Sequence, residues 1–344
     1  METANSLRND MSIRATDIRD ALGVAPSTFT EIITKNDIKY IEESQGTSRG
    51  HAKSLNWTEI RKLLQVRGFH YPSPAKVITF AMQKGGVGKT TSTFFTSQRI
   101  AGYGSKVLVI DADPQGNLTN AFHLEDEGIE IDENTPILAD VLDQNRKDKV
   151  SIEDAIIPIY DNLHLLPSTP TNSIIDSIIE AQYPNPAKTL TKIIDPLKAK
   201  YDYIIIDSAP AINKLLAGIV YASDLIIIPV NPDKFSEMGL GQTMDQIALI
   251  KKEFEGCRAV PKIVFTRYDA REFTSMKYLA EIASKYKDQM FETPIRTASD
   301  LKNAISKKED LFAYKTSNAR EDYDRLTREI MGLNEVFSKK RRDN

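Results

Sequence analysis

The sequence predicts an α/β protein with a mainly parallel sheet and a phosphate-binding loop, preceded by a small winged helix-turn-helix domain. Three observations lead to this fold class. From about residue 75 onward, near-continuous apolar runs alternate with helical segments, as buried parallel strands and their crossover helices do. A glycine-rich loop joins the first of these runs to a helix. Before residue 75, two short helical segments flank a glycine turn.

Composition limits the class of protein. Of the 344 residues, 41% are hydrophobic and 27% are charged, as in globular proteins. Cys257 is the single cysteine, which excludes an intrachain disulfide and a metal cluster held by cysteines of one chain. No apolar run approaches the ~18 residues that a membrane span needs, and the N-terminus lacks the apolar core of a signal peptide. We therefore expect a cytoplasmic protein.

The N-terminal segment is predicted to contain a helix-turn-helix. Residues 16–22 and 26–33 read as two helices, with a tight turn at residues 23–24. The second helix of such a motif enters the major groove of DNA and presents polar side chains to the bases. Here these side chains would be Ser27, Thr28, Thr30 and Lys35.

Residues 40–55 read as a strand, a polar loop and a second strand, which is how a wing is built. Arg49 and Lys53 on this wing suit contacts with DNA phosphates, and residues 57–64 form a helix that could cover it. The alternative is a small domain that touches only protein. Because Pro72 and Pro74 disfavour helix, we place a linker at residues 71–74, with one domain at 1–74 and the other at 75–344.

A phosphate-binding loop follows the apolar strand at residues 77–82 and precedes a helix at 92–101. Its backbone N–H groups would cradle the phosphates of a nucleotide, and the helix N-terminus adds positive potential. Lys89 would reach the β- and γ-phosphates, and the Thr90 hydroxyl would ligate Mg²⁺. A second lysine at the start marks a deviant Walker loop. The predicted nucleotide-binding residues here are Lys84, Gly85, Gly86, Val87, Gly88, Lys89, Thr90 and Thr91.

Four further apolar runs, at residues 106–110, 201–206, 225–230 and 262–265, each end in a polar loop, where open α/β sheets bind ligands. Asp207 and Asp111 are the expected carboxylates near Mg²⁺, and Asp113 would orient the attacking water. Residues 114–117 would form a mobile switch beside the γ-phosphate. We expect the purine near Asn231, Pro232, Thr266 and Arg267.

The remaining segments connect these strands. Residues 123–160 are acidic and are expected to be loop-rich, with one helix around 138–142. Residues 171–200, 238–255 and 322–337 are expected to be helical.

Three of these motifs together resemble the ATPase motifs of the ParA partition proteins, of the larger type with an N-terminal winged helix-turn-helix. They are Lys84–Thr91, Asp111–Asn117 and Asp207–Pro210. The resemblance implies a ParA-type ATPase domain over residues 75–344 and a homodimer that closes over ATP and Mg²⁺. Lys84 would cross to the partner's nucleotide, and Lys84, Lys89 and Asp113 would serve hydrolysis. One departure is the single Pro210, because the family often has two prolines after the Walker B aspartate.

The resemblance also implies partners. The ATP dimer would coat nonspecific DNA on the nucleoid, with Arg296 and Lys302 among the candidate contacts. A ParB-like centromere-binding protein would stimulate hydrolysis, and the N-terminal domain would bind and repress the partition operator. Two alternatives stay open: a MinD-like positioning ATPase that cycles on the membrane, and a transcriptional repressor that senses ATP. For the former, an apolar stripe of Leu326, Ile330, Leu333 and Phe337 would meet the membrane, although interspersed acidic residues favour a helix docked on the domain.

Overall fold

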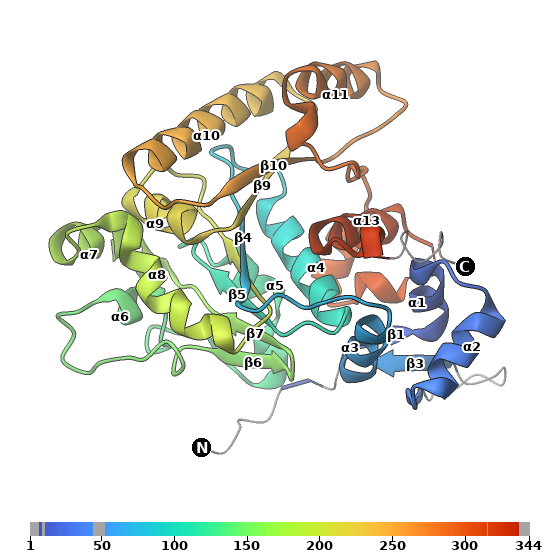
Figure 1. Ribbon diagram of the computed structural model, residues 1–344. Helices are drawn as coiled ribbons and strands as arrows, with labels where there is room; N and C mark the ends of the chain where they lie inside the picture. The colour runs from blue at the N-terminus through green and yellow to red at the C-terminus, as the bar shows by residue number, and fades with distance from the viewer. Residues whose placement is uncertain (1–6, 9–10, 44–51, 315, 337–344) are drawn as a thin grey trace.

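The computed structural model describes residues 7–8, 11–43, 52–314 and 316–336. Its larger part is built on a seven-stranded sheet in the order β10-β9-β4-β8-β5-β7-β6 (Figure 1). Every neighbouring pair is parallel except β6 and β7. The mainly parallel α/β architecture predicted from the sequence is confirmed. The strands are β4 (Lys76–Phe80), β5 (Val107–Asp111), β6 (Ile157–Tyr160), β7 (Leu163–Leu166), β8 (Tyr203–Asp207), β9 (Leu225–Val230) and β10 (Val260–Phe265).

The sequence led us to expect residues 123–160 as loop-rich. Strand β6 lies at the end of this stretch and pairs with β7, which follows it, in a hairpin. Pro158 lies within β6, and proline inside an apolar run argues against a strand because it has no N–H to donate. The structure accommodates it at the edge of the sheet, where β6 offers carbonyls instead. The backbone N–H groups of Leu7 and Arg8 donate to the carbonyls of Pro158 and Ile159, at 3.2 and 3.1 Å.

Helices cover both faces of the sheet, since successive strand residues point to opposite sides. Tyr203 and Ile205 of β8 belong to the apolar core on one face, and Ile204 and Ile206 to that on the other. The first face is covered by α4 (Lys89–Gly102), α5 (Asn117–Ala121), α13 (Asn318–Met331) and the N-terminal segment. The second is covered by α6 (Leu138–Leu142), α7 (Ile175–Gln182), α8 (Thr189–Ile194), α9 (Lys214–Ala222), α10 (Lys234–Glu253) and α11 (Phe273–Tyr286).

The C-terminal helix α13 is docked on the domain. Leu326, Ile330 and Leu333 are at most 5% exposed and belong to the core that α13 shares with α4. Phe337, the fourth residue of the expected apolar stripe, lies outside the described residues. Among the described residues, no helix combines the length and apolarity needed to cross a membrane.

The N-terminal segment has the two helices, the hairpin strands and the covering helix that the sequence predicts. They are α1 (Ala15–Leu22), α2 (Pro26–Lys35), β2 (Ile41–Glu43), β3 (Ala52–Asn56) and α3 (Trp57–Val66). Gly23 has φ of 61° between the helices, a left-handed conformation that favours glycine. The structure adds β1 (Ser12–Arg14), which pairs antiparallel with β3 to give the sheet order β1-β3-β2. The tip of the expected wing, with Arg49, lies outside the described residues.

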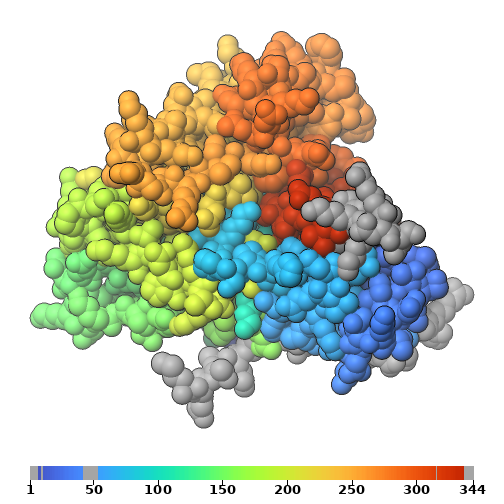
Figure 2. All heavy atoms as spheres, viewed as in Figure 1, coloured from blue at the N-terminus to red at the C-terminus, as the bar shows by residue number. Residues whose placement is uncertain are grey.

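This segment packs directly against the larger part of the chain, and the two share one hydrophobic core (Figure 2). Arg61 of α3 forms two hydrogen bonds with the Asp202 carboxylate, at 2.6 and 3.0 Å, and donates to the carbonyl of Gly104 at 2.9 Å. Tyr71, in the expected linker, donates its hydroxyl to the Tyr103 carbonyl at 2.7 Å. The N-terminal module is thus fixed to the far end of α4, the helix that begins at the phosphate-binding loop.

Candidate functional site

The loop between β4 and α4 has the conformation that phosphate binding requires. Gly86 and Gly88 have φ of 73° and 93°, values that other residues rarely adopt. Residues 85, 86 and 88–91 of this loop line a cavity of about 630 Å³ at the carboxyl ends of the strands. Helix α4 starts at Lys89, so its free N–H groups face the same space.

Thr90 lines this cavity and lies beside the buried Asp207, so the structure brings these two predicted residues together. The Thr90 hydroxyl donates to one carboxylate oxygen of Asp207 at 2.7 Å, and the Thr93 hydroxyl donates to the other at 3.2 Å. Burial, together with the nearby Asp111 carboxylate, raises the pKa of Asp207 to about 7. A buried carboxylate beside a hydroxyl is a group that a divalent cation would stabilise in its charged form.

Lys89 is 7% exposed and lies beside these acidic groups. Burial lowers the pKa of Lys89, and the charges of Asp207 and Asp113 oppose that effect. Its ammonium approaches the carbonyl of Lys84 at 3.4 Å. The side chain is therefore folded back under the loop, where it faces the cavity floor.

Asp111 and Asp113 have different surroundings. Both oxygens of Asp111 accept hydrogen bonds from its own chain: one from the N–H and hydroxyl of Thr119, both at 2.8 Å, and the other from the Asp113 N–H at 3.2 Å. Burial raises the pKa of Asp111 to about 6. Asp113 lines the cavity and accepts from the Gln115 N–H at 3.0 Å. Asp111 thus braces the expected switch, whereas Asp113 faces the cavity.

The donor set fits Mg²⁺ held jointly with a nucleotide. The described residues contain no cluster of three His, Cys, Asp or Glu side chains that would hold an ion alone. Mg²⁺ in phosphate sites takes one or two protein oxygens and completes its shell with phosphates and water. Thr90 and Asp207 are the side chains placed to serve it.

Lys84 points to a partner within its own chain. Its ammonium bonds to Asp233 at 2.6 Å and to the Ser236 hydroxyl at 3.0 Å, both near the start of α10. Asp233 also caps α10 by accepting from the Ser236 N–H at 2.9 Å. Nothing in the sequence indicated the Lys84–Asp233 pair, because its members are 149 positions apart.

A second cavity of about 340 Å³ adjoins the loop and contains Thr266 and Arg267. It shares Gly88, Thr91 and Arg267 with the first cavity, so the two are compartments of one site. Asn231 lies behind the loop instead: its amide accepts from the Thr266 hydroxyl at 2.9 Å, and its NH₂ group approaches the Gly86 carbonyl at 3.5 Å. Neither Asn231 nor Pro232 lines these two cavities.

The residues predicted to contact DNA have separate locations. Ser27, Thr30 and Lys35 are exposed on α2, whereas Thr28 is half-buried. Lys53 is exposed on β3 with its ammonium 4.9 Å from the centre of the Tyr40 ring.

The two predicted DNA contacts in the C-terminal part are placed differently. Arg296 forms an ion pair with Asp322 at 2.7 Å. Lys302 lines the second cavity beside the phosphate-binding loop.

Several residues of the site escaped the sequence analysis. Thr93 and Thr119 hold the two strand-end carboxylates, and the Ser168 hydroxyl donates to the Asp113 carbonyl at 2.7 Å. The contact of Thr93 with Asp207 could have been inferred from the sequence, since residues three apart share a helix face and Thr90 was already assigned. Thr119 and Ser168 carry no such signal.

Comparison with known proteins agrees with this geometry. Residues 75–257 match the family model described as an AAA domain. The sporulation initiation inhibitor protein Soj of Bacillus subtilis is 28% identical over 74% of this chain and 98% of its own length. The chromosome partitioning protein ParA of Myxococcus xanthus is 28% identical over 78% of this chain and 92% of its own.

A solved structure gives the same result. The putative plasmid partition protein of Borrelia burgdorferi B31, bound to AMPPNP, is 27% identical with a TM-score of 0.61. The match covers 77% of this chain and 99% of that one. The phosphate-binding loop, whose Thr90 donates to the strand-end carboxylate of Asp207, agrees with these similarities. The chain therefore belongs to the ParA family of P-loop ATPases.

Proposed function

We propose that this protein hydrolyses ATP with Mg²⁺ and uses the cycle to partition a plasmid or chromosome. The observation that carries the proposal is that Lys89, Thr90 and Asp113 line one cavity at the phosphate-binding loop, with the buried Asp207 directly behind Thr90. Catalysis of phosphoryl transfer depends on positioning and on compensating positive charge. These four side chains supply both.

Each residue has a role in this proposal. The loop N–H groups and Lys89 bind the phosphates. Thr90 and Asp207 would hold Mg²⁺, which when bound would neutralise phosphate charge. Asp113 faces the cavity from the switch and orients the attacking water. Asp111 keeps the switch in place through Thr119.

The ATP-bound form is proposed to be a homodimer in which Lys84 contacts the partner's nucleotide. Lys84 must first leave Asp233, and an ion pair with 29% and 38% side-chain exposure costs little to break. Exposed apolar side chains support a protein interface on this side: in the first two turns of α10, Phe235 is 73% exposed and Met238 is 55% exposed. The Lys84 ammonium lies 5.8 Å from the Phe235 ring centre.

The DNA functions form the rest of the proposal. The dimer binds nonspecific DNA on the nucleoid, a ParB-like partner stimulates hydrolysis, and the N-terminal module binds the operator as a winged helix-turn-helix. The exposed polar face of α2, with Ser27, Thr30 and Lys35, supports a recognition helix. The names of the relatives support partition as the process.

One series of gel shifts and ATPase assays tests this proposal. Apo, ADP-bound and ATP-bound protein are compared on operator and random DNA, with Lys89→Ala as the binding-deficient variant. We expect Lys89→Ala to lose turnover, and Asp113→Ala to bind ATP but turn over poorly. Normal hydrolysis by Lys89→Ala would refute the assigned site.

The operator contact needs its own variants. Removing residues 1–74 would expose the core that this segment shares with α4, so substitutions on the surface of α2 are preferable. Lys35→Gln and Thr30→Ala should weaken the operator footprint and leave ATPase activity unchanged. An unchanged footprint would contradict the assignment of α2.

The membrane-cycling alternative loses its main support, since the apolar face of α13 is buried on the domain. ATP-dependent pelleting with anionic liposomes would restore it. Lost repression with unchanged plasmid inheritance would instead indicate a repressor that senses ATP.

A further inference from the structure

Helix α12 (Asp300–Ser306) lies along the candidate nucleotide site but outside the motifs that identify it. Leu301 and Lys302 line the smaller compartment, next to Gly88 and Thr91 of the phosphate-binding loop. Ile305 and Ser306, one turn later, line the larger compartment with Lys89 and Asp113. This one short helix therefore borders both compartments.

Helix α12 contacts the protein core through one buried residue and two half-buried ones. Within the helix only Ala304 is buried, at 2% exposure, and the other residues are half-buried or exposed. A seven-residue helix with one buried side chain is too short to hold its position by itself. Leu301 and Ile305 pack half-buried against the core, and contacts made at the end of the helix add to this packing.

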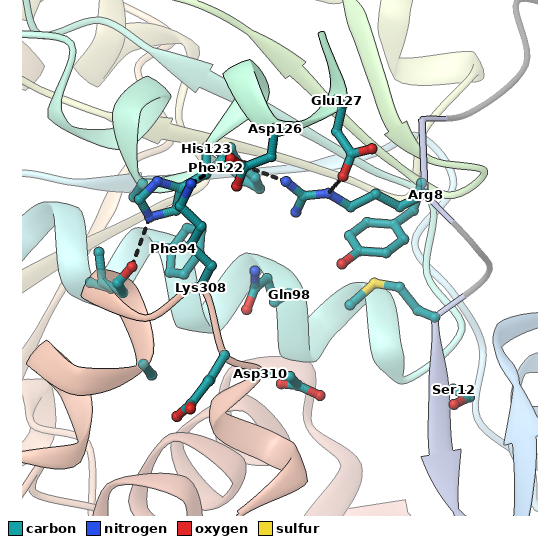
Figure 3. A pocket seen from close by; sticks show the side chains of 16 residues that line it. Arg8, Ser12, Phe94, Gln98, Phe122, His123, Asp126, Glu127, Lys308 and Asp310 are labelled. Atoms are coloured by element: carbon teal, nitrogen blue, oxygen red, sulfur yellow. Dashed lines mark hydrogen bonds and ion pairs between the residues drawn. The ribbon is translucent and has the colours of Figure 1, made fainter. Parts of the chain in front are cut away.

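Such contacts exist between the end of α12 and the segment that follows the switch. The His123 Nε2 atom donates to the Ile305 carbonyl at 2.7 Å (Figure 3). Lys308, just past α12, pairs with Asp126 and lies 3.8 Å from Glu125. We call these contacts of residues 123–126 with residues 305–308 the clasp.

The backbone of the clasp is strained on both sides. His123 has φ of 49° and Lys308 has φ of 60°, left-handed conformations that cost a non-glycine residue about 1 kcal/mol or more. His123 also lines the larger nucleotide compartment, six residues after the predicted switch. The strain therefore occurs where the switch segment meets the helix that borders the site.

Among the described residues, Lys302 has no hydrogen-bonding or ion-pair partner for its ammonium, in contrast to Arg296 nearby, which pairs with Asp322. An unpaired ammonium beside a phosphate-binding loop is attracted to a bound nucleotide. Lys302, considered above as a DNA contact, is better placed to bind nucleotide.

We infer that α12 is the retaining element of the nucleotide site: Lys302 contacts the nucleotide, and His123 is a positioning residue that holds α12 over it through the clasp. The inference rests on the proposed nucleotide site, but not on dimerisation, DNA binding or partition. Its consequence is kinetic. Opening the clasp lets α12 move away, and bound nucleotide then leaves faster.

Stopped-flow release of mant-ADP from the full-length protein, in the presence of Mg²⁺ and excess unlabelled ADP, tests the clasp. His123→Ala removes the donor to the Ile305 carbonyl, and release should become about 2- to 10-fold faster, the effect of one lost hydrogen bond. His123→Gln places an amide N–H near the position of Nε2, so it should restore slow release. A structural defect alone would not be rescued in this way.

Lys302 is tested by equilibrium binding of mant-ADP. Lys302→Gln should raise Kd about 5-fold or more, because a charge-assisted contact is lost. Lys307→Gln is the matched control: Lys307 is an exposed lysine at the end of the same helix, it borders neither compartment, and its substitution should change Kd less than 2-fold.

The outcomes separate this inference from the proposed function. Equal release rates for wild type, His123→Ala and His123→Gln would overturn the clasp, and equal Kd values for Lys302→Gln and Lys307→Gln would overturn the ligand role. In either case wild-type binding of mant-ADP would leave the nucleotide site intact. Absence of binding by the wild type would refute the site itself, and this inference with it. In steady-state assays, His123→Ala should raise KM for ATP without lowering kcat.

Discussion

Asp207→Asn should stabilise the nucleotide-free protein at pH 8, although the residue serves the site. Asp207 is fully buried, and its pKa is raised from the ordinary 3.8 to about 7 by burial and by the Asp111 charge. At pH values between about 4 and about 7, Asp207 keeps its proton in the folded protein but has lost it in the unfolded chain. Stability from this group is therefore greatest at low pH and is lost as pH rises through about 7.

The magnitude follows from the difference between the two pKa values. Each pH unit between about 4 and 7 corresponds to about 1.4 kcal/mol, so an ionised Asp207 costs up to roughly 4 kcal/mol at pH 8. A buried amide also loses its hydration, which reduces the gain. We expect Asp207→Asn to raise the free energy of unfolding by about 1–3 kcal/mol at pH 8, and by much less at pH 5.

Urea unfolding of the nucleotide-free protein in EDTA, at pH 5 and pH 8, measures this difference. Asp202→Asn is the matched control: Asp202 precedes the same strand, is 7% exposed and pairs with Arg61, so its loss should destabilise at both pH values. A second arm adds Mg²⁺ and ADP, which should stabilise the wild type more than Asp207→Asn. If Asp207→Asn shifts stability equally at both pH values, the electrostatic account of the site is refuted.

Three further predictions concern packing and the loop lysine. Arg61→Ala should lower the free energy of unfolding by about 2–4 kcal/mol in urea, because a largely buried carboxylate loses its partner; a change below about 1 kcal/mol would contradict this. Gly104→Ala should destabilise by about 2 kcal/mol or more, since its Cβ would lie 2.7 Å from the Arg61 nitrogen, whereas Gly128→Ala, equally left-handed but with nothing within 4 Å, should cost about 1 kcal/mol. Equal losses would rule out the clash. Asp233→Asn keeps the helix cap but frees Lys84, so ATP-dependent dimerisation measured by sedimentation should strengthen up to about 5-fold. A weaker dimer would mean that Asp233 itself serves the interface.

Local pattern predicted much of the fold and site. The five apolar runs became β4, β5, β8, β9 and β10, because strands buried on both faces need near-continuous apolar residues. The phosphate-binding loop could be predicted equally well, since its glycines and lysine form one short contiguous motif. The predicted helix at 171–200 is broken into α7 and α8, with Pro184 and Pro186 between them.

Contacts between segments that are far apart in the sequence could not be predicted from it. The purine was expected near Asn231 and Pro232, but Asn231 braces the loop from behind. Lys302 was considered for DNA because a lone lysine carries no sign of its surroundings. The Lys84–Asp233 pair and the His123–Ile305 bond join residues 149 and 182 positions apart.

Short contiguous motifs were enough to identify the candidate phosphate and metal ligands, because that chemistry depends on residue type at fixed spacing. The folded chain was needed to see that Asp207, rather than Asp111, meets Thr90, and that α12 and its clasp border the nucleotide cavity. Strand order and helix packing bring these segments together, and both are set by the whole hydrophobic core rather than by any single stretch of the chain.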